Sequence, residues 1–139
     1  MNRLLYLKIT ALLSAVVLFA ACFFPWIHIA SLAITVTGVE PAGTNFGKPG
    51  YFHLIMVVIF IACTLVQRVG AKRLNLLVTA LNLAWALRNF FVIPACSGGE
   101  CPVKLIGLWL VLLTSVVMLL SAMIPDIKLP LNRDDKSTA

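Results

Sequence analysis

Charged residues are scarce in this chain: they make up 12% of its 139 residues, whereas a soluble domain carries about 25%. Hydrophobic residues make up 61%. A water-soluble fold of this length cannot hide so much apolar side chain, because surface grows nearly as fast as volume in small domains. The composition therefore excludes an ordinary soluble domain and predicts a protein embedded in a lipid bilayer.

Acidic residues are scarcer still, and none of the five lies inside a long apolar run. Small four-helix exporters that exchange protons for a cation need a carboxylate within the membrane, and intramembrane catalysis needs an acid or a base. The sequence therefore favours a non-catalytic protein over an enzyme. The net charge of +6 comes from basic residues that flank apolar runs, so no nucleic-acid partner is predicted.

Four apolar runs have about the 20 residues that a transmembrane helix needs. The predicted spans cover residues 4–25, 51–69, 74–93 and 103–124, and three of them end at a proline. The predicted fold class is an all-α membrane protein, a single domain over residues 1–139 in which four transmembrane helices form an antiparallel bundle. A small β-hairpin is expected in the first outer loop.

Lysine and arginine predict the orientation of the spans, because cytoplasmic loops are enriched in them. One side of the predicted bundle carries Arg3, Lys8, Arg68, Lys72, Arg73, Lys128, Arg133 and Lys136, and the other carries Lys48, Arg88 and Lys104. Both termini and the tail at 125–139 are therefore predicted to be cytoplasmic, and the loops at 26–50 and 94–102 to face outward. The chain has no Asn-x-Ser/Thr site, which fits the plasma membrane of a bacterium, its inner membrane.

The first run also has features of a cleaved signal peptide. Basic residues precede it, and Ala20-Ala21-Cys22 is similar to a lipoprotein cleavage site. The apolar stretch continues to Ile29, however, which favours a retained helix.

The first outer loop contains β-branched residues in an alternating pattern. Trp26 to Ile29 and Ile34 to Thr37 predict the two strands of the hairpin, with a turn at Ser31-Leu32. In this topology the chain resembles the broad tetraspan class that includes claudins. The claudin Gly-Leu-Trp motif belongs in that loop, whereas here Gly107-Leu108-Trp109 lies in the fourth run, so no family is assigned.

The second outer loop contains Cys96 and Cys101 around two glycines. A disulfide is expected there in an oxidising compartment. We interpret it as a structural bridge, since a Cys-x4-Cys pair lacks the Cys-x-x-Cys spacing of thiol oxidoreductases. Two thiols alone do not complete a zinc site.

Polar residues within the runs are the candidates for a binding site. Arg88 is expected to reach outward and to pair with Glu100, Glu40 or a lipid phosphate. Asn75, Asn82 and Asn89 recur every seven residues and predict a helix face packed against protein, with Asn82 in an interhelical hydrogen bond. We therefore take Arg88, Asn82, Trp26 and Glu100 as candidates for lipid or partner binding.

His28 and His53 are the candidate metal or haem ligands, but neither has a carboxylate close in sequence to orient it, and no metal is predicted. No haem or quinone cofactor is predicted either.

Three functions fit these features. The first is an accessory or scaffold subunit of a larger membrane complex, which contacts other membrane-protein subunits, or copies of itself, through its outer face. The second is a thiol–disulfide or quinone-linked membrane oxidoreductase that uses Cys96 and Cys101, with Arg88 near the quinone. The third is a lipid-binding or small-molecule transport protein that uses Arg88 and Asn82.

Overall fold

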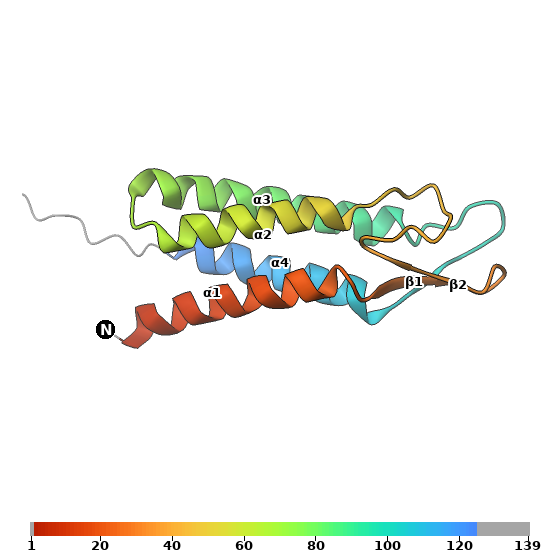
Figure 1. Ribbon diagram of the computed structural model, residues 1–139, viewed down its shortest axis with the longest axis horizontal. Helices are drawn as coiled ribbons and strands as arrows, with labels where there is room; N and C mark the ends of the chain where they lie inside the picture. Colours follow the sequence, from red (N-terminus) through yellow and green to blue (C-terminus); the bar gives the residue numbers. More distant parts are fainter. Residues whose placement is uncertain (1, 125–139) are drawn as a thin grey trace, which may run out of the picture.

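The computed structural model describes residues 2–124, and their side chains from residue 5 onward. Four helices lie side by side and run alternately up and down (Figure 1). They are α1 (Asn2–Ala21), α2 (Gly50–Leu65), α3 (Val69–Val92) and α4 (Ile106–Met123). The tail predicted at 125–139 and the side chain of Arg3 lie outside the described residues.

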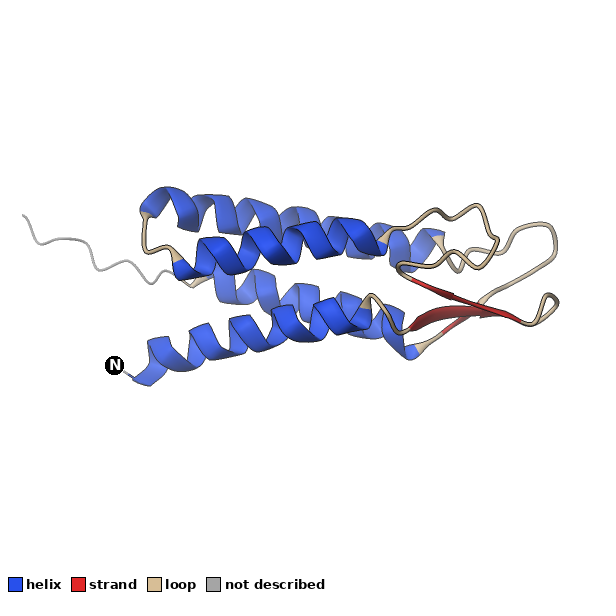
Figure 2. Cartoon of the chain, in the orientation of Figure 1, coloured by secondary structure: helices blue, strands red, loops and turns tan. Residues whose placement is uncertain are grey.

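A three-stranded antiparallel sheet lies at one end of the helices (Figure 2). Its strands are β1 (Pro25–Ile29), β2 (Ile34–Thr37) and β3 (Val103–Lys104), in the order β2-β1-β3. We call this the sheet end. The opposite end carries Lys8, Arg68, Lys72 and Arg73, and we call it the basic end.

The prediction of four membrane spans is wrong for this structure. Within residues 2–124, only α3, with 24 residues, and α4, with 18, are both long and apolar enough to cross a membrane. α2 is apolar but shorter, with 16 residues. The apolar stretch Leu5–Ala21, which is the part of α1 whose side chains the structure describes, is also shorter than α4.

The predicted boundaries of the first two spans also need correction. The second span was expected to reach residue 69, but Val66 and Arg68 have extended backbone angles (φ −85°, ψ 119° and φ −118°, ψ 146°), which end α2 and precede α3. The first span was expected to reach Pro25, which instead begins β1. The predicted hairpin is present, with His28 opposite Thr35, but Val103 pairs with the other side of His28, so the hairpin is part of a larger sheet.

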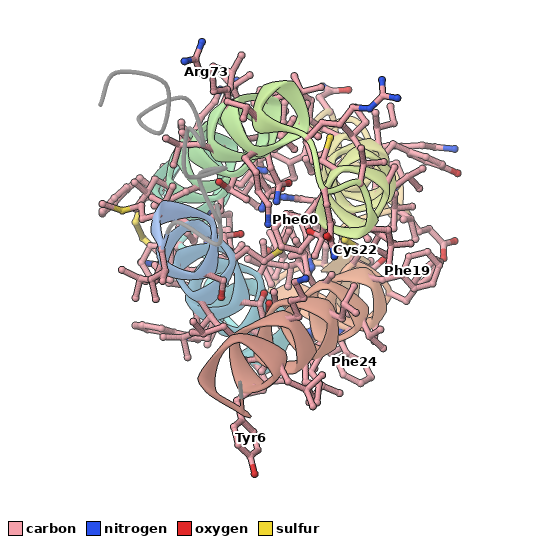
Figure 3. The ribbon with its side chains drawn as sticks, turned by 90° about the vertical axis from the view of Figure 1, so that its left-hand side faces the viewer. Tyr6, Phe19, Cys22, Phe24, Phe60 and Arg73 are labelled. Atoms are coloured by element: carbon pink, nitrogen blue, oxygen red, sulfur yellow. A yellow bond between two sulfur atoms is a disulfide. The ribbon has the colours of Figure 1, made fainter. Side chains whose placement is uncertain are left out.

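The helices place large apolar side chains on their outer surface. Tyr6 and Phe19 on α1, and Phe24 in the turn after it, extend away from the bundle, whereas Phe60 points into its middle (Figure 3). The interior contains these polar residues besides its apolar core: Ser14, His53, Thr64, Asn75, Thr79, Asn82, Asn89, Thr114 and Ser115. This distribution is the reverse of that in a soluble bundle, where the outward faces are polar.

Candidate functional site

Trp26 fixes the sheet to the helices. Its side chain is fully buried, and its indole Nε1 donates a hydrogen bond to the Ala21 carbonyl at 2.9 Å. The backbone N–H of Leu105 donates to the Trp26 carbonyl at 2.8 Å, which ties the start of α4 to β1. Trp26 was expected at a lipid or partner interface, but the structure places it in the core.

Glycines at two positions make room for Trp26. A Cβ on Gly38 would lie 2.5 Å from Trp26 Cζ2, and one on Gly107 would lie 2.8 Å from Trp26 Cδ1 and 2.6 Å from the Pro25 carbonyl oxygen. Real Cβ atoms essentially never come so close to another atom. The sheet end can therefore close around the indole only because these two positions have no side chain.

The cysteine loop at the sheet end forms the expected disulfide between Cys96 and Cys101. Gly98 and Gly99 both have positive φ, at 61° and 88°, and the backbone groups of Ser97 and Glu100 exchange hydrogen bonds of 2.9 and 3.1 Å across them. Positive φ at two central residues is the geometry of a type I′ turn, which glycine adopts without strain. Both cysteines and Glu100 are exposed.

The other two cysteines are separate from this loop. Cys22 and Cys63 are free and buried. Cys22 follows the last residue of α1, and burial raises the pKa of its thiol to about 12. At neutral pH this thiol keeps its proton and is a poor nucleophile.

Arg88 and Asn82 lie on different sides of α3. Arg88 is exposed, and its guanidinium carbon lies 4.9 Å from the centroid of the Trp85 ring, in a cation–π contact. Asn82 is completely buried in the bundle. The two residues therefore do not share the face on which a binding site was expected.

The two histidines have separate environments. His28 in β1 is half-buried, and its Nδ1 lies 3.1 Å from Thr35 Oγ1. His53 in α2 is fully buried, and its ring makes an edge contact with Trp26 at 6.1 Å between centroids. Within residues 2–124 no three histidine, cysteine or acidic side chains come together in a way that could hold a metal ion.

A chain of hydrogen bonds crosses the interior at His53. His53 Nδ1 lies 2.7 Å from Asn82 Oδ1, Asn82 Nδ2 donates to Ser115 Oγ at 2.9 Å, and Ser115 Oγ donates to the Val111 carbonyl at 2.7 Å. The Val111 carbonyl can only accept a hydrogen bond, so the Ser115 hydroxyl donates to it and must accept from the Asn82 amide nitrogen. Asn82 therefore presents its oxygen to His53, and Nδ1 of His53 carries the proton.

Several interior polar atoms have no hydrogen-bond partner in the described part of the chain. They are His53 Nε2, Asn75 Oδ1 and both amide atoms of Asn89. Asn75 and Asn89 are nevertheless where the seven-residue spacing predicted them, on the face of α3 that packs against protein. Buried polar atoms without partners are costly, so such positions mark places where a small molecule or water is favoured.

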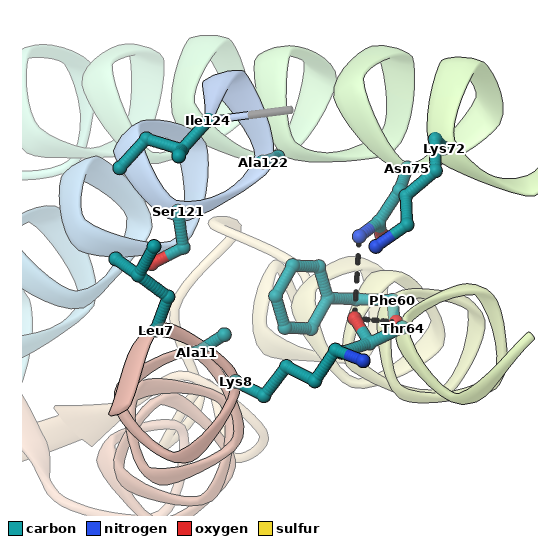
Figure 4. A pocket seen from close by; sticks show the side chains of 10 residues that line it. All are labelled: Leu7, Lys8, Ala11, Phe60, Thr64, Lys72, Asn75, Ser121, Ala122 and Ile124. Carbon is teal, nitrogen blue, oxygen red and sulfur yellow. Dashed lines mark hydrogen bonds between the residues drawn. The ribbon is translucent and has the colours of Figure 1, made fainter. Parts of the chain in front are cut away.

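A cavity opens at the basic end, between all four helices (Figure 4). Its volume is about 40 Å³, and its lining includes Lys8, Thr64, Lys72 and Asn75. Sequence patterns place most of the candidate binding residues at the sheet end. They assign Lys8 and Lys72 to the orientation of the helices. Thr64 on α2 lines the cavity together with Lys8 on α1 and Lys72 on α3. No pattern in the sequence predicts that these three residues lie close together.

No family model matches the chain, and the searches of curated proteins and of solved structures also found no match.

Proposed function

We propose that this protein is a non-catalytic accessory subunit of a membrane-protein complex and that it binds its partner through the sheet end. The observation that carries this proposal is the fixed position of the sheet. Trp26 holds β1 on the bundle, while β2 is an edge strand of the described sheet. An edge strand offers backbone groups to a further strand, and a surface that is already ordered loses little conformational freedom on binding.

Exposed apolar residues on the same end support a protein partner. Leu32 at the β1–β2 turn is 64% exposed, and Val103 in β3 is 57% exposed. Leu32 lies in a turn and Val103 in a strand, so neither side chain is on a helix that could cross the bilayer. We therefore place the partner's contact on a segment of another membrane protein that projects from the bilayer.

We further propose that the protein is multi-pass in a plasma membrane, such as a bacterial inner membrane, with α3 and α4 crossing it. The two long apolar helices support the crossing. Four basic residues gather at the basic end, where α1 begins and α4 ends, and this favours a cytoplasmic location for that end and for both termini.

The orientation is tested with a membrane-impermeant maleimide on intact and on permeabilised cells. Two reporter cysteines are introduced, one at a time, in a variant that lacks Cys96 and Cys101 and keeps the buried Cys22 and Cys63: Gln67→Cys in the exposed turn before α3, and Ser97→Cys at the sheet end. Ser97→Cys should react in intact cells and Gln67→Cys only after permeabilisation. The reverse pattern would show that the orientation is inverted.

The accessory role is tested by mild detergent extraction and identification of the proteins that co-purify. Leu32→Asp, which places a charge at the exposed turn, should lose the partner, whereas the matched Leu32→Met should keep it. The proposal is overturned if nothing co-purifies with the wild type, or if Leu32→Asp retains the same proteins. If the native mass is a multiple of the 15.1 kDa chain, the partner is another copy of this protein, and the complex is a homo-oligomer.

The exposed disulfide favours one second candidate, a thiol–disulfide oxidoreductase linked to a quinone. In this reaction a substrate dithiol is oxidised while the Cys96–Cys101 bond is reduced, and a quinone then accepts the two electrons and two protons. Purified protein is incubated with a dithiol and a soluble quinone, with the Cys96→Ser/Cys101→Ser variant as the control. Equal rates for the two proteins would remove this candidate.

A further inference from the structure

Trp85 on α3 brings two basic residues together near the sheet end. Its indole Nε1 donates a hydrogen bond to the Pro49 carbonyl at 3.1 Å, and Pro49 directly follows Lys48 in the chain. The face of the same indole holds the guanidinium of Arg88, whose carbon lies 4.9 Å from the ring centroid. One side chain therefore places the loop that carries Lys48 beside Arg88.

Aromatic rings support both of these cations. Lys48 Nζ lies 5.7 Å from the centroid of the Tyr51 ring, and the Phe52 ring packs against Trp85 at 4.9 Å between centroids. A cation–π contact restricts where a flexible charged side chain lies, while its N–H groups stay available as donors. We call Lys48, Tyr51, Phe52, Trp85 and Arg88 the cation–aromatic patch.

The charge of this patch is positive. Lys48 and Arg88 are exposed, and among residues 2–124 the acidic side chains are Glu40 and Glu100, neither of which forms an ion pair with them. Two exposed cations without a carboxylate partner favour an anionic ligand. They disfavour a cationic headgroup such as choline, because both charges repel it and because they already cover ring faces that could hold it.

The position of Arg88 along α3 indicates where the anion comes from. About 6 Å of helix separates Arg88 from Val92, the last residue of α3, and α3 is long and apolar enough to cross a membrane. Leu87 and Phe91 beside it are apolar and exposed. At this depth the long side chain of an arginine reaches the phosphate layer of a bilayer, so the ligand is expected to be a phospholipid.

We propose that the cation–aromatic patch binds the phosphate of an anionic phospholipid in the leaflet at the sheet end. The Arg88 guanidinium donates paired hydrogen bonds to two phosphate oxygens, and the Lys48 ammonium adds a second positive charge. The acyl chains lie along the exposed apolar side chains of α3. This inference rests on the proposed crossing of the bilayer by α3, but it does not depend on a partner protein at Leu32.

The proposal is tested on the full-length protein in an uncharged detergent, by native mass spectrometry and by titration with lipid. Phosphatidylglycerol is compared with phosphatidylcholine, whose headgroup has no net charge. We expect a preference of about thirtyfold for phosphatidylglycerol, because each basic residue near a phosphate contributes about fivefold. Arg88→Gln and Lys48→Gln should each remove about fivefold of this preference. Equal affinities of the wild type for the two lipids would overturn the proposal.

Lys104→Gln is the matched control. Lys104 is also exposed at the sheet end, and its Nζ lies 4.0 Å from the centroid of the Phe90 ring. Phe90 packs against Trp109 of α4, whereas Trp85 packs against α2, so this lysine is separate from the patch. Lys104→Gln removes one charge from the same end, and the affinity should stay within about twofold. If it has the same effect as Arg88→Gln, the binding is a general attraction to the sheet end and the proposal fails.

The paired hydrogen bonds are tested with Arg88→Lys, which keeps the charge and the exposed position. An ammonium group cannot make two parallel hydrogen bonds to one phosphate. Arg88→Lys should therefore bind phosphatidylglycerol several-fold more weakly than the wild type, and more tightly than Arg88→Gln. If Arg88→Lys binds as tightly as the wild type, the paired contact is wrong.

Two further measurements separate this proposal from its alternatives. Leu32→Asp should lose the partner protein and keep the preference for phosphatidylglycerol; if it loses the preference, the lipid is held by the partner and the proposal is overturned. Millimolar glycerol phosphate, which has the headgroup chemistry without acyl chains, should leave the bound lipid in place. If it displaces the lipid, the patch binds a soluble phosphate ester and the lipid is not its ligand.

Discussion

Nδ1 of His53 lies 2.7 Å from Oδ1 of Asn82, and this contact joins α2 to α3 in the middle of the bundle. Asn82 also donates to Ser115 on α4, so a single amide connects three helices. Hydrogen bonds between apolar helices hold them together where no hydrophobic effect between the helices does so. Asn82 is therefore the residue whose loss should most directly separate the helices.

Asn82→Ala should lower the free energy of unfolding by about 1–3 kcal/mol, because it removes two interhelical hydrogen bonds and leaves His53 Nδ1–H without an acceptor. Thermal unfolding in detergent measures the effect. Asn45→Ala, in an exposed loop, is the matched control and should change stability little. Equal unfolding temperatures for the two variants would show that the Asn82 hydrogen bonds do not contribute to the free energy of unfolding.

The His53 ring should carry its proton on Nδ1, since the direction of the hydrogen-bond chain is fixed by the Val111 carbonyl. Nitrogen-15 NMR at neutral pH distinguishes a protonated ring nitrogen from an unprotonated one. A His28→Asn variant leaves His53 as the only histidine and assigns its signals. A proton found on Nε2 would contradict both the tautomer and the orientation of the Asn82 amide.

Gly107→Ala should destabilise the protein by about 1–3 kcal/mol, because the new methyl group overlaps Trp26 and the Pro25 carbonyl. Gly70→Ala is the matched control in a helix: nothing lies within 4 Å of its Cβ position, and alanine is the better helix former. It should be neutral or slightly stabilising. Tryptophan fluorescence during unfolding reports both effects, and a Gly107→Ala protein as stable as Gly70→Ala would contradict the close packing at Trp26.

Cys96→Ser/Cys101→Ser should lower stability by about 2 kcal/mol, since the bridge closes a short loop and restricts the unfolded chain. The proteins that co-purify should remain the same, because the proposed contact is at Leu32. Thiol labelling of the folded wild type should be slow before reduction, since Cys22 and Cys63 are buried, and rapid at Cys96 and Cys101 afterwards. Loss of partner proteins from a folded double variant would move the binding site to the cysteine loop.

Local patterns in the sequence predicted several parts of the structure correctly. The alternation around His28 and Thr35 predicted paired strands, the two glycines predicted a tight loop closed by Cys96 and Cys101, and the spacing of Asn75, Asn82 and Asn89 predicted a buried face of α3. Each of these signals lies within a short stretch of chain. Backbone geometry and helical or strand periodicity are sufficient to interpret them.

The features that were missed depend on contacts between distant residues. Val103–Lys104 is too short to show an alternating pattern, and it becomes a strand only because β1 lies beside it. Trp26 follows an apolar run and so fits a membrane interface, but two distant glycines admit it to the core. Apolar content also predicted four spans, but among the described helices only α3 and α4 combine the length and the apolar character that a bilayer crossing needs.

The packing of Trp26 against Gly107 also sets an order of events during synthesis. Trp26 emerges early from the ribosome, whereas Gly107 and the Leu105 N–H that binds its carbonyl belong to the last third of the chain. Until that segment has been made, the Trp26 indole is not packed against Gly107, and β1 is not paired with β3. The sheet end must therefore close after translation of α4 has begun, and a nascent chain that stops in the cysteine loop keeps this tryptophan open to chaperones and proteases.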